Sequence, residues 1–289
     1  MAVKFFGQYL VEKGIVSSET LLKAIELQES TNLSFGETAI AMQLMNTADV
    51  ERVNMAQRGE DLRFGDMAVK LGILSEEQVR HVLTRQKNDH IYIGESLVRV
   101  GGLTPGELEI RLGEFKAEQA LYATDKVAIP AGAPFPQFLE IAADLTYKML
   151  TRVALLNCRP DLPVVADRLE PNDVIAAMDL YGDINARYFI SVSTAIQKKI
   201  ARAILSEENV DGEPQEVLED TVMEFVNVVC GNLVAKAAQI GINIDIAPPE
   251  ITDGSEGATP LLGQTGLLFP VALAEGGEVT MAIFIKDGD

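Results

Sequence analysis

The sequence predicts two domains, an all-α domain of repeated helix pairs and then an α+β domain in which an antiparallel sheet packs against long helices. Three observations predict this order: a 29-residue repeat in the first half, a segment rich in proline and glycine near residue 122, and alternating apolar patterns joined by turn residues in the second half. At 289 residues the chain is long enough for two cores. The predicted domains are residues 1–122 and 123–289.

Four glycines mark the repeat at a constant spacing of 29 residues: Gly7, Gly36, Gly65 and Gly94. Each unit continues with an apolar pair and a residue suited to the left-handed end of a short helix. These end residues are Gly14, Gln43, Gly72 and Gly101. A second helix then begins after a good N-cap residue. The predicted N-caps are Ser17, Asn46, Ser75 and Thr104. Apolar residues at i, i+3 and i+4 give every helix pair one buried face, so four stacked pairs are expected to form one domain.

The repeat units resemble MshEN, the N-terminal domain of type II secretion and pilus ATPases, which is also found attached to signalling proteins. A 24-residue unit, a five-residue spacer and a closing glutamine at Gln28, Gln57 and Gln86 carry the resemblance. Some MshEN domains bind cyclic di-GMP, and the third unit fits the pattern best. The resemblance therefore implies a nucleotide site at Arg63, Phe64, Gly65, Gly72 and Gln86.

The other units depart from that pattern where it matters for a nucleotide. Arginine is the planar, permanently charged group suited to phosphate and purine, but the matching positions hold Phe5, Ser34 and Tyr92, and unit four ends in Phe115. The alternative is a degenerate helical module for docking or dimerisation, in which the glycines meet turn requirements.

The second half is predicted to begin with an amphipathic helix over residues 136–156, after the interruption KVAIPAGAPFPQ. Two strands joined at Gly182-Asp183 follow. The remaining predicted elements are helices at about 194–206 and 215–240 and strands at about 242–246, 266–274 and 278–286. Antiparallel strands with long helices set against them indicate an α+β domain.

The helix containing EVLEDTVMEFVNVVCGN, residues 216–232, is apolar yet carries acids and an amide. At 100° per residue its valine stripe falls on one side. Asp220, Glu224, Asn227 and Gly231 fall together on the opposite side, which must face water or a partner. Taken alone, this stripe is also what an ordinary solvated helix face presents.

The flanking sequence makes the stripe more specific, because Glu-x-x-Asn-x-x-x-Gly is followed by INIDIAPPEITDG. This combination resembles the CheX branch of the CheC/CheX/FliY family, chemotaxis phosphatases that remove phosphate from the aspartyl-phosphate of the response regulator CheY. The resemblance implies that Asn227 is catalytic, that Glu224 pairs with a lysine of the regulator, and that Asp220 and Gly231 support the contact. It also places the magnesium ion on the regulator, so that no metal site is expected in this chain.

CheC-like proteins carry two copies of the helix motif, and this chain offers only one. The first predicted helix of the second half has Glu140, but the residue three positions later is Ala143 and not an asparagine. One site for each chain fits the CheX branch better.

The leading hypothesis is a phosphatase of a phosphorylated CheY-like receiver domain, preceded by a regulatory or docking module. One alternative is a non-catalytic signalling module that uses the CheX-like domain for dimerisation or docking, and another is a cyclic di-GMP effector without catalysis. A homodimer through exposed sheet edges is also expected. The sequence contains no P-loop, GxGxxG or HExxH motif that would favour another enzyme class.

Composition excludes several partners and sites. A formal net charge of -19 argues against a nucleic-acid binder, and residues 1–122 hold 13 of the 24 basic but only 18 of the 43 acidic residues, so the second half is the more acidic. Cys158 and Cys230 are far apart in sequence and indicate two reduced thiols. Without a long uninterrupted apolar run or a signal-peptide pattern, we expect a cytoplasmic protein with no membrane insertion.

Overall fold

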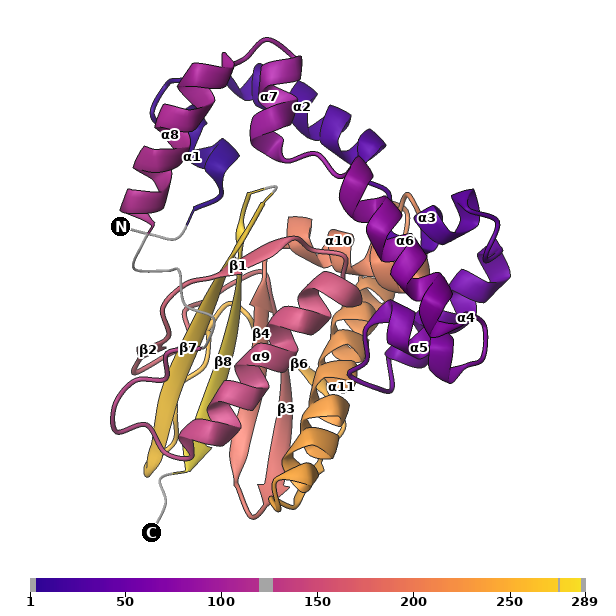
Figure 1. Cartoon of the computed structure of the whole chain (residues 1–289). Coiled ribbons are helices and arrows are strands. Elements are labelled where there is room, and N and C mark those ends of the chain that lie inside the picture. The colour runs from indigo at the N-terminus through magenta and orange to yellow at the C-terminus, as the bar shows by residue number, and fades with distance from the viewer. Residues whose placement is uncertain (1–3, 120–126, 275, 287–289) are drawn as a thin grey trace. The chain divides into compact units, whose positions relative to one another are not determined.

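The computed structural model describes residues 4–119, 127–274 and 276–286 (Figure 1). The chain divides into two compact units, one within Lys4–Ala120 and the other beyond it. The first is all-helical and the second is α+β, which confirms the predicted fold class. The predicted boundary between residues 122 and 123 lies outside the described residues.

The first unit consists of four helix pairs. They are α1 (Phe6–Glu12) with α2 (Ser18–Thr31), α3 (Phe35–Ala41) with α4 (Thr47–Gln57), α5 (Phe64–Lys70) with α6 (Glu76–Asp89), and α7 (Ile93–Arg99) with α8 (Pro105–Glu118). All four predicted N-caps of the second helices are confirmed, because each side chain accepts a hydrogen bond from the backbone N–H three residues on. The four predicted end residues of the first helices also have positive φ.

The repeat glycines are explained by close packing within each helix pair. A Cβ at Gly7 would lie 2.6 Å from Leu21 Cδ1, and one at Gly94 would lie 2.5 Å from Leu108 Cδ1. A Cβ at Gly36 or Gly65 would similarly approach the side chain of a valine. In all four units the contacting residue lies 14 residues after the glycine. The glycine therefore lets the second helix of the pair approach the first, and this requirement needs no ligand.

The four pairs belong to one compact unit, but they do not stack in their order along the chain. Units one and four share a core that includes Leu10, Ala24 and Leu97, whereas units two and three share a separate core that includes Val53 and Val82. In a solenoid each unit contacts only its neighbours in sequence. Here the first and last units pair instead.

Hydrogen bonds between two connecting segments join these paired cores. Asn32 Nδ2 donates to the Ile91 carbonyl oxygen, and the Ile91 N–H donates back to Asn32 Oδ1, both at 2.8 Å. Two of the closing glutamines bond here as well: Gln28 Nε2 donates to the same Ile91 oxygen and Gln86 Nε2 donates to the Leu33 oxygen. The glutamines thus stabilise the connections rather than ending in solvent.

We expect Asn32→Ala to destabilise the repeat domain by about 1–3 kcal/mol, because it leaves the N–H of the buried Ile91 without its acceptor. Hydrogen exchange of the Ile91 amide measures the effect locally. Asn54→Ala, at an exposed position of α4, is the matched control and should leave that exchange rate unchanged. Equal exchange rates for Ile91 in the two variants would contradict this role of Asn32.

The second unit contains three helices and a sheet of eight strands in its described residues. The helices are α9 (Pro136–Arg152), α10 (Thr194–Leu205) and α11 (Gln215–Gln239). The strands are β1 (Cys158–Pro160), β2 (Val164–Val165), β3 (Val174–Gly182), β4 (Ala186–Val192), β5 (Ile244–Ile246), β6 (Glu250–Thr252), β7 (Gln264–Leu273) and β8 (Glu278–Lys286). The predicted elements are present at nearly their predicted bounds, whereas β1, β2 and β6 were not predicted.

All strand pairs of the sheet are antiparallel, in the order β1-β7-β8-β4-β3-β5. The four long strands are β7, β8, β4 and β3, and the outer two each pair with two short strands. Strand β2 pairs with β7 in addition to β1, and β6 pairs with β3 in addition to β5. Strands of only two or three residues therefore lie at both edges of the sheet, and the homodimer through sheet edges stays a prediction.

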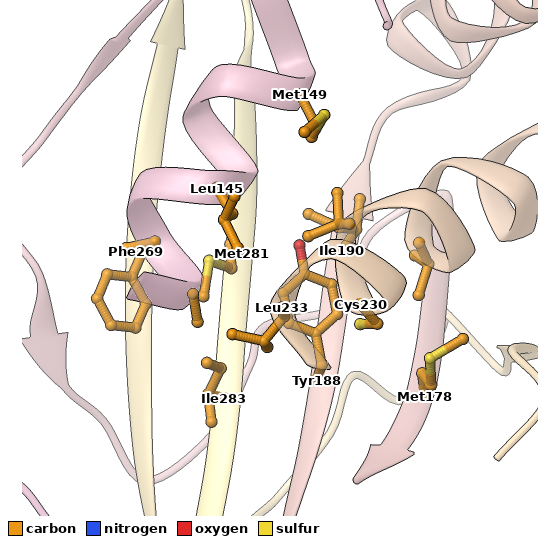
Figure 2. Close-up of a cluster of buried hydrophobic side chains, with 14 of the residues drawn as sticks. Leu145, Met149, Met178, Tyr188, Ile190, Cys230, Leu233, Phe269, Met281 and Ile283 are labelled. Carbon is orange, nitrogen blue, oxygen red and sulfur yellow. The ribbon is translucent and has the colours of Figure 1, made fainter. Parts of the chain in front are cut away.

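The main core lies between one face of the sheet and the three helices, and α9 and α11 run side by side across that face (Figure 1). Figure 2 shows Leu145 and Met149 of α9 and Leu233 of α11 converging on strand residues such as Tyr188. The Tyr188 hydroxyl is buried but paired with Thr146 Oγ1 at 2.9 Å. Burial raises the pKa of the Cys230 thiol in the same core, so the thiol stays protonated.

A smaller cluster covers part of the opposite face of the sheet. Leu169, from the loop before β3, belongs to this cluster together with Phe189 and Phe284. Leu169 and Ala258 exchange two backbone hydrogen bonds of 2.7 and 2.9 Å, which hold two loops together over the sheet. Gly257, next to Ala258, has a φ of +69°.

Candidate functional site

Helix α11 supplies the candidate site, and its buried side forms as the sequence predicts. Val222, Val226, Val229 and Leu233 are all fully buried against the main core. The helix is apolar and long enough to pass for a membrane span, but 56% of its 18-residue apolar window is buried inside the domain. That burial is typical of a core helix.

The opposite side of α11 is exposed and carries the predicted stripe. Asp220, Glu224, Asn227 and Gly231 are all exposed. Asn227 Nδ2 lies 3.5 Å from Glu224 Oε2, a long hydrogen bond that leaves most of the amide free to bind another group. The structure therefore brings together all four residues of the predicted phosphatase stripe.

Two residues of this stripe reduce the stability of the helix itself. Asp220 lies beyond the first turn, where a carboxylate no longer gains from the helix dipole, and it stands four residues from the like-charged Glu224, which costs about 0.2–0.5 kcal/mol. Gly231 costs about 1 kcal/mol relative to alanine in a helix interior. A Cβ at Gly231 would meet nothing within 4 Å, so packing does not require glycine there.

The stripe also lacks compensating charge. In the part of the chain that the structure describes, no lysine or arginine forms an ion pair with Asp220 or Glu224. By contrast, Asp144 of α9 is paired with Lys148 at 2.6 Å. The carboxylates beside Asn227 are therefore available to a cation from another molecule.

The chemistry available at this face comes from the side-chain amide. An amide offers an acceptor oxygen and two N–H donors and does not titrate near neutral pH. It can therefore orient a water molecule at any physiological pH, but it cannot act as a general base. Among the described residues there is also no group of three or more His, Cys, Asp or Glu placed to hold a metal ion.

Sequence reasoning missed the full length of the exposed stripe. It continues to Glu216 on one side and to Ala235 and Ala238 on the other, all of them exposed. The same 100° projection would have found them if it had been extended by about one turn toward the N-terminus and two turns toward the C-terminus. On α9, Ala143 is fully buried, so the position that lacks the asparagine also lacks access to a partner.

The five candidate nucleotide residues of the repeat domain have different surroundings. Phe64 packs against Phe35 with ring centroids 5.4 Å apart, and Gly65 lies under Val79. Gly72 ends α5 in the left-handed region and Arg63 is the exposed N-cap residue of that helix. Of the five, only Gln86 lines the 310 Å³ pocket between α3 and the end of α6, and its amide nitrogen is bonded to Leu33.

Residues 174–272 match the family model of the chemotaxis phosphatase CheX. The C-terminal domain is CheX-like. The match begins at β3, ends in β7 and contains the whole of α11 with its exposed stripe. It includes no part of the helical repeats, so their resemblance to MshEN stays a prediction.

Solved structures of similar fold include CheX from Desulfovibrio desulfuricans, with a TM-score of 0.46, 20% identity, and coverage of 52% of this chain and 99% of that chain. CheX from Vibrio vulnificus has a TM-score of 0.45 and 22% identity, and the match covers 52% of this chain and 99% of that chain. A CheX from Borrelia burgdorferi was solved in complex with CheY, BeF3 and magnesium. It has a TM-score of 0.45 and 22% identity, and the match covers 52% of this chain and 98% of that chain. No curated protein matches the sequence.

Proposed function

We propose that the CheX-like domain removes the phosphoryl group from the aspartyl-phosphate of a CheY-like response regulator. In this reaction water attacks phosphorus, the bond to the aspartyl oxygen breaks, and inorganic phosphate leaves with the aspartate carboxylate regenerated. The acyl phosphate is already activated, so catalysis consists mainly of positioning the water in line with the breaking bond. Asn227 holds that water, as a glutamine does in small GTPases.

The observation that carries this proposal is the exposure of the Asn227 amide on a helix within the matched residues. A side chain on the convex face of a helix can enter a pocket of another protein, whereas a buried amide could not. The bound magnesium and the phosphorylated aspartate would both belong to the regulator. In this proposal Glu224, one turn from Asn227, pairs with the lysine beside the phosphoryl group and fixes the register of the helix.

The direct test mixes the full chain with a CheY-like receiver domain phosphorylated by acetyl phosphate and follows the release of inorganic phosphate. We expect release to accelerate well above the intrinsic rate of the receiver, in proportion to the concentration of the chain. An unchanged rate across receivers from several chemotaxis systems would favour a non-catalytic docking module.

We expect Glu224→Ala to weaken the complex and raise KM about tenfold or more, because an unpaired lysine would remain at the interface. The value of kcat should change less than KM, since the water-holding amide remains. Steady-state phosphate release at several receiver concentrations separates the two constants. Glu140→Ala on α9 is the control, and an equal rise of KM in both variants would contradict this role of Glu224.

For the helical repeats we propose docking or regulation of the phosphatase rather than nucleotide binding. Three closing glutamines donate hydrogen bonds to backbone carbonyls within the domain. At each of the four repeat glycines, a side chain of the second helix of the pair fills the space where a Cβ would lie. These contacts explain the repeat pattern without cyclic di-GMP, and calorimetric titration of the full chain with cyclic di-GMP tests this directly: heat of binding would overturn it.

A further inference from the structure

We propose that a pocket on the outer face of the CheX-like sheet binds an extended peptide segment of another protein, with a bulky apolar side chain in the pocket and a lysine or arginine beside Asp179. The outer face is the one turned away from α9 and α11, which lie across the other face (Figure 1). The inference goes beyond the proposed function, because it adds a second binding surface that is not part of the α11 stripe.

The pocket has a volume of 510 Å³ and lies where β3 ends and β4 begins. Side chains along a strand alternate between the two faces of a sheet. Tyr188 belongs to the main core, so Arg187 and Phe189 on either side of it lie on the outer face, and both line the pocket. The loop residues 257–259 and 261 form the facing wall. A ligand in this pocket therefore leaves the exposed stripe of α11 free.

The apolar part of the pocket includes two aromatic rings and a leucine. Phe189 and Phe284 lie with their ring centroids 4.7 Å apart and are buried. Leu261 also lines the pocket, but 72% of it is exposed. Exposed apolar residues beside a cavity are typical of a binding surface. An apolar side chain of the ligand would cover Leu261 and fill the space next to it.

Neutral polar groups also line the pocket and favour a peptide. In the described part of the chain, the side chains of Asn185 and Thr259 form no hydrogen bond, so their amide and hydroxyl groups can bind the N–H and C=O groups of an extended backbone. The buried Nε–H of Arg187 has no hydrogen-bond acceptor among the described residues, because the Asp179 oxygen at 3.6 Å is too distant. A peptide carbonyl would supply one.

The charges at the pocket favour a basic ligand. Arg187 forms ion pairs with Asp179 at 3.6 Å and with Glu250, so one guanidinium is shared by two carboxylates. The side chain of Asp179 is 56% exposed, and the half of the chain that contains it is the more acidic. A lysine or arginine beside Asp179 complements this charge, whereas a phosphate group would be repelled.

A peptide array tests the recognition. The full chain is incubated with immobilised hexapeptides Gly-Ser-X-Z-Ser-Gly, in which X and Z each cover all twenty amino acids. Binding should concentrate where X is leucine, isoleucine, methionine or phenylalanine and Z is lysine or arginine. The Kd of the best peptide in solution should rise with salt concentration. No binding, even binding across the array, or a preference for an acidic Z would overturn the inference.

Two substitutions in the full chain test the apolar and the charged part of the pocket separately. Leu261→Ser and Asp179→Asn should each raise the Kd of the best peptide several-fold, and Asp179→Asn should have no effect when Z is glutamine. Leu155→Ser and Glu207→Gln are the matched controls, because Leu155 is 70% exposed, Glu207 is exposed, and neither lines the pocket. All four side chains are exposed, so the melting temperatures should stay close to that of the wild type. Equal Kd values for the wild type and both pocket variants would contradict the proposed site.

Hydrogen exchange locates the bound peptide. Exchange of the backbone amides in residues 257–264 should slow when the best peptide is added, and that of α11 should stay the same. Protection confined to α11 would place the ligand on the phosphatase stripe instead. Sedimentation of the free chain tests another occupant, since a dimer that Leu261→Ser dissociates would show that a second copy fills the pocket. Either result would overturn the peptide site, and none of these measurements depends on phosphate release.

Discussion

Asn227→Ala should lower the rate of phosphate release by about 10²–10³-fold or more while leaving the affinity for the receiver nearly unchanged. The magnitude follows from the effect of removing one preorganised polar group that acts on the transition state. The affinity is retained because Glu224, which lies beside the amide, is unaffected and the helix backbone does not change. Stopped-flow or steady-state phosphate release gives the rate, and beryllofluoride-loaded receiver gives the affinity.

A second substitution distinguishes water positioning from general base catalysis. Asn227→Asp keeps the size of the side chain but replaces both N–H donors by a charged acceptor, so it should be as inactive as the alanine variant. Gln239→Ala, at the exposed end of α11, is the control for changes to this helix and should retain full activity. Phosphate release at the wild-type rate by Asn227→Ala would remove the catalytic assignment.

Gly257→Ala should destabilise the CheX-like domain by about 3 kcal/mol. Residue 257 has a left-handed backbone, which costs a non-glycine residue about 1–2 kcal/mol, and its Cβ would overlap the backbone carbonyl oxygen of Leu169, adding about 1–3 kcal/mol. That oxygen is the acceptor of the Ala258 N–H, so the two loops over the sheet would separate. Calorimetry should show the melting temperature of this domain falling by about 6–12 °C.

Gly263→Ala is the matched control for this prediction. It lies in the same loop region with a φ of +77°, but its Cβ would meet nothing within 4 Å. Only the backbone cost of about 1–2 kcal/mol should remain. If the two variants melt at the same temperature, the overlap of an alanine Cβ at position 257 with the Leu169 carbonyl oxygen costs no stability, and the prediction is wrong.

Local patterns predicted the elements well where one rule decides the conformation. The N-cap residues and the left-handed helix ends depend on a few neighbouring atoms, so Ser75 and Gly72 could be assigned from sequence alone. The exposed stripe of α11 followed from periodicity, because valines that must be buried recur every three or four residues on the other face, at positions 222, 226 and 229. The match to CheX includes this stripe, and periodicity alone could not have suggested the phosphatase chemistry that we propose for it.

Features that depend on distant partners could not be predicted in this way. Strand β2 has only two residues, and it is a strand because Val164 and Val165 lie opposite β7, about a hundred residues later in the chain. The pairing of units one and four has the same origin, since their apolar stripes are similar to those of units two and three and do not specify a partner. The glutamines were ambiguous for a related reason: the acceptor of Gln28 is Ile91.

The pairing of the first repeat with the fourth has a consequence for biosynthesis. As the chain leaves the ribosome, repeats two and three can assemble as soon as both have emerged, but repeat one must wait until repeat four has been translated. Its apolar surface, including Leu10 and Ala24, stays exposed during that interval. The apolar surface of the amino-terminal segment should therefore be among the last in the helical region to be buried. We expect a chaperone to bind this segment during synthesis.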